Sequence, residues 1–229
     1  MSNKAERESK RLEAMSLYEK EAISQGYLHI AGIDEVGRGC IAGPVVSAAV
    51  ILPPGELIEG VNDSKKLSPK KRLELAVEIK RRALAWAVAC IFPPYLDSIN
   101  ILNATRETMA MSVRELLLKP DYLLIDALSL PDINIKQQAI IKGDSLSISI
   151  ASASIVAKVE RDKLMENLGL IYPDYGFGSH KGYATREHLQ ALFTHGPCSI
   201  HRASFEPVKS LRSGGLYAEQ PGLFDQFST

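Results

Sequence analysis

The chain has 229 residues, of which 45% are hydrophobic and 24% are charged, and its 27 basic side chains balance its 27 acidic ones. A net charge of zero argues against a globally basic nucleic-acid binder, and no apolar run reaches the roughly 20 residues of a membrane-spanning helix. The charged N-terminus has no signal-peptide pattern, and the three cysteines lie far apart without metal-ligand spacing. These properties predict a globular protein of the cytoplasm with free thiols and no membrane partner.

The first part of the chain alternates helical and strand patterns. Residues 4–25 carry five basic and five acidic side chains among apolar ones, which is typical of a charged, weakly amphipathic helix. A short apolar approach, residues 27–31, and the β-branched run at residues 45–52 predict two strands. The pair Ser68-Pro69 resembles an N-cap followed by a first-turn proline, so a helix is predicted from there to about Arg82.

Further elements follow at short intervals. The predicted strands are residues 84–92, 122–125 and 138–142, and the predicted helices are residues 97–118 and 149–168. No strand pattern follows Ser147, so the last third is expected to be helical and rich in loops. The pattern therefore predicts an α/β domain that opens with three strands and ends in a helical cap.

Four carboxylates stand where predicted strands end. Asp34 and Glu35 belong to the first strand, and Asp126 and Asp144 follow two later ones. Side chains from distant parts of an α/β chain converge at strand ends, and carboxylates without histidine or cysteine suit hard cations such as Mg²⁺ or Mn²⁺. Two such ions about 4 Å apart would orient a water molecule for attack on a phosphodiester. We therefore expect a two-metal site that acts on phosphodiesters.

A glycine-arginine-glycine loop follows the first two carboxylates. Gly37 and Gly39 let the backbone approach a ligand closely, and Arg38 can fork onto a phosphate. A basic patch, residues 62–82, holds eight basic and three acidic side chains. The patch is either a phosphate-binding surface or a solvated helix face.

Several ordered motifs between about residues 28 and 209 closely resemble those of bacterial ribonuclease HII, the type 2 ribonuclease H. They are Gly32-Ile33-Asp34-Glu35-Val36-Gly37-Arg38-Gly39, Asp63-Ser64-Lys65-Lys66-Leu67, Leu124-Ile125-Asp126, Lys142-Gly143-Asp144, Ala153-Ser154-Ile155-Val156-Ala157-Lys158-Val159-Glu160-Arg161-Asp162 and His180-Lys181-Gly182-Tyr183. The resemblance implies a ribonuclease H-like fold, with a five-stranded mixed sheet flanked by helices and a C-terminal helical cap. It also implies metal-dependent hydrolysis of RNA paired with DNA. Cleavage 5′ of single ribonucleotides embedded in duplex DNA, leaving 3′-hydroxyl and 5′-phosphate ends, is part of the same expectation.

The matching positions receive the family's roles by this resemblance. The catalytic and metal-binding carboxylates are then Asp34, Glu35, Asp126 and Asp144. The loop Gly37-Arg38-Gly39 would contact the ribose 2′-hydroxyl, which distinguishes RNA from DNA, and Tyr183 would complete that recognition. The candidate phosphate contacts are Lys65, Lys66, Lys181 and Arg202, and for the last three solvation at the surface is the alternative.

Two groups of residues lie outside these roles. The histidines His180, His188, His195 and His201 lack metal-like spacing, so hydrogen bonding or a position beside a phosphate is expected rather than ligation. In the tail, Gln220, Leu223 and Phe224 resemble the short peptide that binds bacterial sliding clamps. The tail either docks on such a clamp or folds back onto the protein itself.

The assignments divide the chain, expected to be monomeric, into four parts. These are a charged helical extension (1–27), a ribonuclease H-like catalytic domain (28–170), a helical substrate-binding region (171–212) and a flexible tail (213–229). A nuclease or transposase of the same fold would lack the ribose-reading loop and Tyr183, and a type HIII ribonuclease would carry a larger N-terminal domain. A non-catalytic nucleic-acid-binding module would leave four carboxylates that repel a phosphate backbone.

Overall fold

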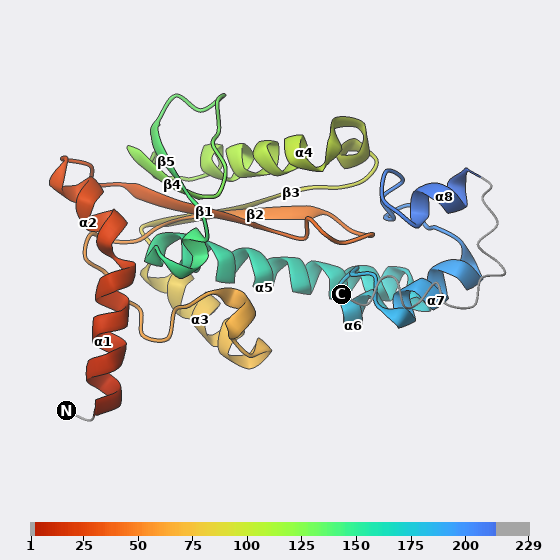
Figure 1. Ribbon diagram of the computed structural model, residues 1–229, viewed down its shortest axis with the longest axis horizontal. Helices are drawn as coiled ribbons and strands as arrows, with labels where there is room; N and C mark the ends of the chain where they lie inside the picture. Colours follow the sequence, from red (N-terminus) through yellow and green to blue (C-terminus); the bar gives the residue numbers. More distant parts are fainter. Residues whose placement is uncertain (1–2, 214–229) are drawn as a thin grey trace. The chain divides into compact units, whose positions relative to one another are not determined.

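The computed structural model describes residues 3–213 (Figure 1). The chain divides into two compact units. The first unit comprises the chain up to Val36 together with Val46–Cys90 and Thr105–Glu160. The second comprises Gly37–Val45, Ile91–Ala104 and the chain from Arg161 onward. The β-sheet belongs to the first unit, apart from one terminal residue in each of two strands.

The sheet is mixed and has five strands in the order β3-β2-β1-β4-β5. Their bounds are β1 (Ile30–Val36), β2 (Val45–Ile51), β3 (Ala85–Ile91), β4 (Tyr122–Asp126) and β5 (Lys136–Ile140). The central strand β1 pairs antiparallel with β2 and parallel with β4, and β4 pairs parallel with β5. Ile33 lies opposite Ile125, so the C-terminal ends of β1 and β4 reach the same edge. The predicted five-stranded mixed sheet is confirmed.

Helices flank the sheet and dominate the C-terminal third. They are α1 (Asn3–Met15), α2 (Leu17–Ser24), α3 (Pro69–Arg82), α4 (Tyr95–Arg114), α5 (Ile148–Ile171), α6 (Phe177–His180), α7 (Arg186–His195) and α8 (Val208–Arg212), with 3-10 turns η1 (Ser64–Lys66), η2 (Gly143–Ser145) and η3 (Pro173–Tyr175). Within residues 3–213, only helices and turns of this kind follow β5, apart from one isolated bridge, as predicted. No helix in this described part is both long and apolar enough to cross a membrane.

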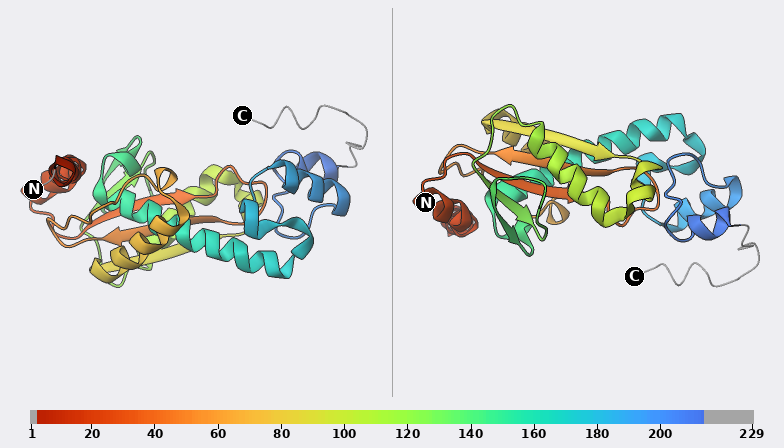
Figure 2. Two further views of the ribbon diagram at one scale, coloured as in Figure 1. Left: turned by 90° about the horizontal axis from the view of Figure 1, so that it is seen from below. Right: turned by 90° about the horizontal axis from the view of Figure 1, so that it is seen from above.

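Both faces of the sheet are covered because successive residues of β2 point to opposite sides. Ala48 and Val50 pack in one hydrophobic cluster with Ile155 of α5, and Ala49 packs in another with Met109 of α4. The two views of Figure 2 show α5 in front of the strands from below and α4 in front of them from above. A strand buried on both faces has the continuous apolar pattern seen at residues 45–52.

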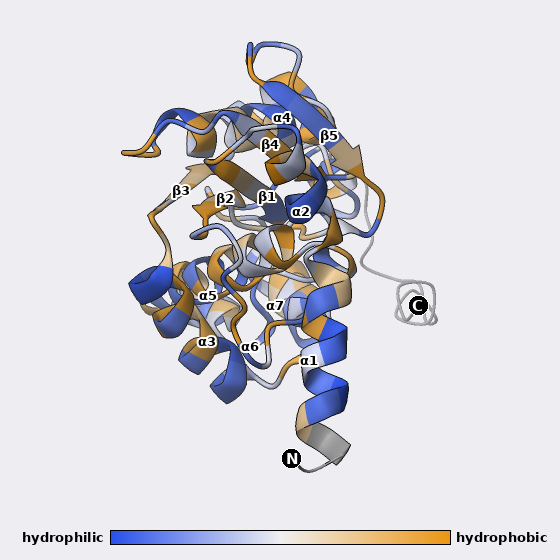
Figure 3. Ribbon diagram, turned by 90° about the vertical axis from the view of Figure 1, so that its left-hand side faces the viewer, coloured by the Kyte–Doolittle hydropathy of each residue, from blue (hydrophilic) through white to orange (hydrophobic). Residues whose placement is uncertain are grey.

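Several predicted elements differ from the structure in their bounds. The first strand, predicted at residues 27–31, is β1 at Ile30–Val36, and the helix predicted at residues 97–118 is α4, which ends at Arg114. The single helix expected at residues 4–25 is two helices, because the chain breaks at Ser16, whose hydroxyl donates to the Glu13 carbonyl at 2.8 Å. The first of them, α1, is mostly hydrophilic (Figure 3). Strand β5 lies two residues before the predicted 138–142, because Lys142 adopts a left-handed conformation (φ 59°) that opens the η2 turn.

Gly32 allows helix α5 to approach strand β1 closely. A Cβ atom at this position would lie 2.1 Å from the carbonyl carbon of Ser149, in the first turn of α5. Backbone therefore packs directly against backbone two residues before Asp34. The glycine that opens the Gly-Ile-Asp-Glu motif thus positions α5 rather than binding a ligand.

Candidate active site

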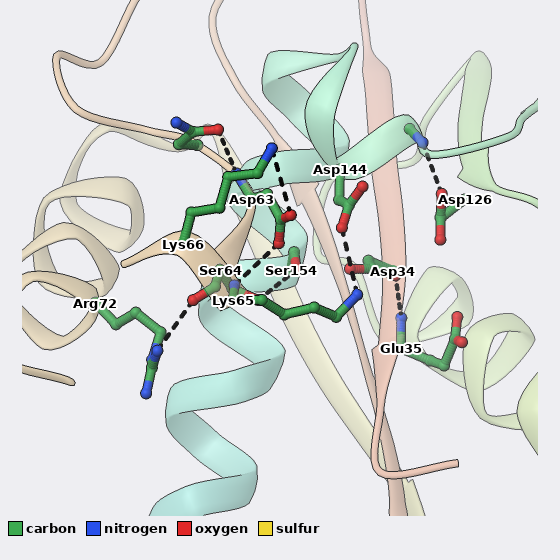
Figure 4. A network of polar contacts seen from close by, with 12 residues as sticks. Asp34, Glu35, Asp63, Ser64, Lys65, Lys66, Arg72, Asp126, Asp144 and Ser154 are labelled. Carbon is green, nitrogen blue, oxygen red and sulfur yellow. Dashed lines mark hydrogen bonds and ion pairs between the residues drawn. The ribbon is translucent and has the colours of Figure 1, made fainter. Parts of the chain in front are cut away.

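Three of the four predicted carboxylates meet at the shared edge of β1 and β4. Asp34 and Glu35 lie on β1, and Asp126 is the last residue of β4. One carboxylate oxygen from each residue lies within 4.8 Å of the other two (Figure 4). The parallel register of β1 and β4 produces this cluster, since Ile33 pairs with Ile125.

The fourth carboxylate, Asp144, lies in the η2 turn beside the same edge (Figure 4). It is not one of the three that gather within 4.8 Å, and its Oδ2 atom lies 3.6 Å from the Nζ atom of Lys65. The Lys65 side chain is 83% exposed, so its ammonium group is open to solvent. Burial works against the charged form, but the carboxylates of Asp144 and Asp34 raise the pKa of Lys65.

The carboxylate of Asp34 is in an electrostatically unfavourable position in this cluster. Burial raises the pKa of Asp34 well above its ordinary value, and the charges of Glu35 and Asp126 raise it further. A hydrogen bond from Ser154 on α5 acts in the opposite direction. A hard divalent cation among these oxygens would remove the repulsion, and an all-carboxylate donor set is what Mg²⁺ and Mn²⁺ prefer. The residues present therefore fit such an ion.

Lys65 is positioned by the η1 turn around it. The Asp63 carboxylate accepts a hydrogen bond from the Lys65 backbone N–H at 2.9 Å, and Ser64 Oγ lies 2.9 Å from Ser154 Oγ. Arg72 of α3 donates to the carbonyl of Ser64 at 3.0 Å. Arg72 and Ser154 had no assigned role in the sequence, and their part is to hold the turn that carries Lys65.

The other two predicted lysines are already engaged in ion pairs. Lys66 Nζ lies 3.7 Å from Asp63 Oδ2 and stays largely exposed. Lys181 Nζ lies 2.6 Å from Glu166 Oε1, with its side chain only 16% exposed. Lys65 is itself paired with Asp144, but its side chain is the most exposed of the three, so its ammonium group is the most available to a phosphate.

Arg202 holds the loop that follows β1, in the second unit. Its guanidinium donates to the carbonyls of Gly43 at 3.0 Å, Arg38 at 2.8 Å and Gly37 at 2.6 Å. The side chain is 0% exposed, and burial lowers its pKa to about 10, so it stays charged at neutral pH. A guanidinium that is bound to three backbone carbonyls and has no access to solvent cannot reach a phosphate. The prediction of a phosphate contact at Arg202 is therefore wrong.

Arg161 is a second buried arginine under the same loop. It donates to the carbonyls of Pro44 at 3.0 Å and Lys181 at 2.8 Å. A Cβ atom on Gly37 (φ 94°) would lie 2.2 Å from Arg161 Nε, so only glycine fits above this guanidinium. Arg161 lies inside a recognised motif, yet the sequence contained no signal for its function.

The arginines fix which side of the loop backbone faces outward. The peptide bonds of the Gly37-Arg38-Gly39 segment are trans, and the C=O and N–H of a trans peptide point in opposite directions. Because the carbonyls of Gly37 and Arg38 point at Arg202, the N–H groups of Arg38 and Gly39 point away from it. The loop thus presents two backbone donors on the side opposite the arginine.

We expect replacement of Arg202 by lysine to destabilise the fold although the positive charge is kept. An ammonium group cannot span three carbonyls, and each buried bond to a charged donor is worth about 1.5–3 kcal/mol. The free energy of unfolding in urea should fall by about 2–4 kcal/mol, whereas the exposed Arg212→Lys change should leave it within 0.5 kcal/mol. Equal stability of the two variants would contradict the role given to Arg202.

Tyr183 is 40% exposed and is anchored by a chain of neutral histidines. His188 Nδ1 donates to the Tyr183 carbonyl at 2.8 Å, and its Nε2 lies 3.1 Å from His201 Nε2. His201 Nδ1 accepts from the Cys198 N–H at 3.0 Å, so its proton lies on Nε2 and is donated to His188. The hydrogen-bonding role expected for these histidines matches this chain.

Acidification should break the histidine chain. Burial lowers the pKa of His188 to about 3 and that of His201 to about 4, below the ordinary 6.5. The unfolded chain therefore binds protons first, and stability is lost as pH falls from 6.5 towards 4, by about 1.4 kcal/mol per pH unit for each ring. Urea unfolding at several pH values measures this slope. The His188→Gln variant should have a slope of unfolding free energy against pH that is smaller by the uptake of about one proton. An unchanged slope would refute the low pKa assigned to His188.

The clamp-peptide prediction at Gln220, Leu223 and Phe224 lies outside the described residues.

The sequence and the fold were compared with those of known proteins. A family model described as Ribonuclease HII matches residues 31–208. The chain belongs to the ribonuclease HII family. It is therefore an endoribonuclease that hydrolyses the RNA strand of RNA–DNA hybrids.

Bacterial and archaeal relatives agree with this membership. The ribonuclease HII of Syntrophomonas wolfei is 60% identical over 95% of this chain and 86% of its own length, and that of Caldanaerobacter subterraneus is 51% identical over 87% and 83%. The ribonuclease HII in a solved PCNA:RNase HII complex from Archaeoglobus fulgidus is 31% identical, with a TM-score of 0.66, over 86% of this chain and 100% of that one. The ribonuclease H2 of Pyrococcus horikoshii, 24% identical with a TM-score of 0.69 over 82% and 99%, shares the fold.

Proposed function

We propose that this ribonuclease HII also incises 5′ of single ribonucleotides embedded in duplex DNA, and that it leaves 3′-hydroxyl and 5′-phosphate ends. The observation that carries the catalytic part is the cluster of Asp34, Glu35 and Asp126, with oxygens within 4.8 Å of one another. Such a cluster is unfavourable beside a phosphate backbone unless cations compensate it.

The carboxylates Asp34, Glu35, Asp126 and Asp144 would hold two Mg²⁺ or Mn²⁺ ions. Bound there, the cations would lower the pKa of a water molecule and neutralise charge on the phosphodiester. The chain's own part is to hold the oxygens in place, as the Gly143 N–H does by donating to Asp126 Oδ1 at 2.7 Å. Lys65 adds a positive charge beside Asp144, where it would attract a phosphate group.

Choice of the cleavage position would come from the loop Gly37-Arg38-Gly39. Its outward N–H groups can donate to the 2′-hydroxyl, the group that separates RNA from DNA. Arg202 and Arg161 keep those donors in place before substrate binds, which reduces the ordering cost on binding. The half-exposed ring of Tyr183 would complete the contact with the ribose.

One assay tests the proposal. Labelled duplex DNA with a single ribonucleotide, a matched all-DNA duplex and an RNA–DNA hybrid are incubated with Mg²⁺, Mn²⁺ or a chelator. We expect a cut 5′ of the ribonucleotide that leaves a 3′ end extendable by a DNA polymerase, no cut in all-DNA, and none with chelator. Cleavage of the hybrid without cleavage at the single ribonucleotide would overturn the embedded-ribonucleotide activity. Undiminished cleavage in chelator would overturn the metal assignment.

We further propose that residues 28–170 carry catalysis and residues 171–212 contribute to substrate binding, in a cytoplasmic monomer. The support is that all four carboxylates fall in the first range and Tyr183 in the second. The tail peptide at Gln220, Leu223 and Phe224 would bind a sliding clamp. If the intact protein and one lacking residues 214–229 bound the clamp equally, the tail proposal would fail.

A further inference from the structure

The N-terminal helices reach the start of α5, although they precede residues 31–208, which the family model matches. Glu19 of α2 is only 8% exposed, and its Oε1 atom accepts two hydrogen bonds. The donors are Ser147 Oγ at 2.6 Å and the Ser149 N–H at 3.0 Å. Ala22, one turn further along α2, packs in the same hydrophobic cluster as Ile150 of α5. Helix α2 is thus docked on the first turn of α5.

Ser147 connects this contact to the turn that carries Asp144. Its backbone N–H donates to the Gly143 carbonyl at 2.8 Å, and its Oγ accepts from the Ile150 N–H at 3.2 Å. The N–H of Gly143 donates in turn to Asp126 Oδ1 at 2.7 Å. One continuous chain of hydrogen bonds therefore runs from Glu19 through Ser147 and Gly143 to Asp126, and Asp144 is part of the same turn.

Burial makes each link of this chain specific. Ser147 is fully buried, so its hydroxyl loses a buried acceptor if Glu19 is removed. The second oxygen of Glu19, Oε2, is buried without a hydrogen bond among residues 3–213, which costs stability. The stabilising interactions of this carboxylate are made by Oε1, which accepts the hydrogen bond of the Ser147 hydroxyl and places negative charge at the N-terminus of α5.

We propose that Glu19 is a positioning residue of the active site. Through Ser147 it fixes the turn at residues 143–147, and thereby the directions in which Asp126 and Asp144 present their oxygens. The proposal rests on the proposed function in so far as those carboxylates hold the metal. Residues that orient metal ligands typically change metal affinity or activity by 10–100-fold when they are removed.

Four variants separate positioning from general stability. Glu19→Ala removes the acceptor, Ser147→Ala removes the donor, and Glu19→Gln keeps an oxygen able to accept both bonds. Leu12→Ala is the matched control, because it opens the core beneath α1 and removes none of these hydrogen bonds. Thermal unfolding measures the stability of each variant, so that Glu19→Ala and Ser147→Ala can be compared with Leu12→Ala at a similar loss of stability.

Three measurements then test the proposal. Titration with Mn²⁺ alone should show at least tenfold weaker binding in Glu19→Ala and Ser147→Ala, with Glu19→Gln and Leu12→Ala close to the unaltered protein. On a ribonucleotide-containing duplex, kcat should fall by a similar factor while KM changes little. In the double variant Glu19→Ala/Ser147→Ala the two losses of Mn²⁺ affinity should be less than additive, because both substitutions remove the same Glu19–Ser147 hydrogen bond.

Hydrogen exchange separates failure of this proposal from failure of the proposed function. In metal-free protein, exchange of the amides at residues 143–147 should accelerate in Glu19→Ala and not in Leu12→Ala. If the unaltered protein binds no Mn²⁺, the carboxylate assignment fails, and exchange alone still decides whether Glu19 orders the turn. Unchanged exchange, or additive effects of Glu19→Ala and Ser147→Ala on Mn²⁺ affinity, would overturn the role given to Glu19.

Discussion

Replacement of Asp126 by asparagine is expected to reduce kcat for cleavage of a ribonucleotide-containing duplex about a thousandfold or more. Charge stabilisation by a bound cation is worth several kcal/mol, and the neutral amide removes one of the charges that would hold the cation. The asparagine carbonyl can still accept the hydrogen bond from Gly143, so the fold should persist. Single-turnover cleavage measures the effect, and circular dichroism verifies the fold.

Asp121→Asn is the matched control for this change. Asp121 immediately precedes β4, whereas Asp126 is the last residue of that strand. The carboxylate of Asp121 accepts hydrogen bonds from the backbone N–H groups of Leu28 and His29. An asparagine there should leave cleavage within a few-fold of normal. Cleavage by Asp126→Asn that remains within tenfold of the unaltered protein would refute the metal-site assignment.

Replacement of Gly32 by alanine is expected to cause a large loss of stability for the addition of one methyl group. The new Cβ would lie 2.1 Å from the backbone of Ser149, and neither β1 nor α5 has a flexible side chain there that can move aside. We expect the free energy of unfolding to fall by about 4 kcal/mol or more, with loss of cleavage as α5 shifts. Urea unfolding followed by circular dichroism measures this.

Gly178→Ala serves as the comparison for that substitution. A Cβ at Gly178 would meet only Glu166 Cα, at an ordinary 3.8 Å, so the change should cost less than about 1 kcal/mol. If both alanine variants unfolded at the same urea concentration, close packing at Gly32 would not explain that glycine.

Local signals made much of the fold predictable. Ser68-Pro69 marks the start of α3, where the Ser68 hydroxyl accepts from the Lys71 N–H at 3.3 Å, and the apolar run at residues 45–52 marks a strand buried on both faces. The carboxylates at Asp34 and Asp126 were predictable because a strand pattern and a motif coincide there. The break between α1 and α2 at Ser16 was not predictable, since it depends on one hydrogen bond from the Ser16 hydroxyl to the backbone carbonyl of Glu13.

The supporting residues escaped prediction for a different reason. Arg202 and Arg161 bind backbone carbonyls up to 165 and 119 residues away, and a carbonyl is present at every position whatever its side chain. Glu19 likewise bonds a serine 128 residues later. A charged residue in a sequence is usually taken for a surface group, and only the fold shows which of them are buried among main-chain acceptors.

The long reach of the two arginines bears on how the protein is made. A nascent chain that ends before Arg161 contains all four carboxylates, but neither of the groups that hold the carbonyls of residues 37–44. Synthesis runs from the N-terminus, and domains order as their parts emerge. The loop with its outward donors is therefore completed last, after Arg202 has left the ribosome, and an unfinished chain carries the cutting groups without the ordered loop that would direct them.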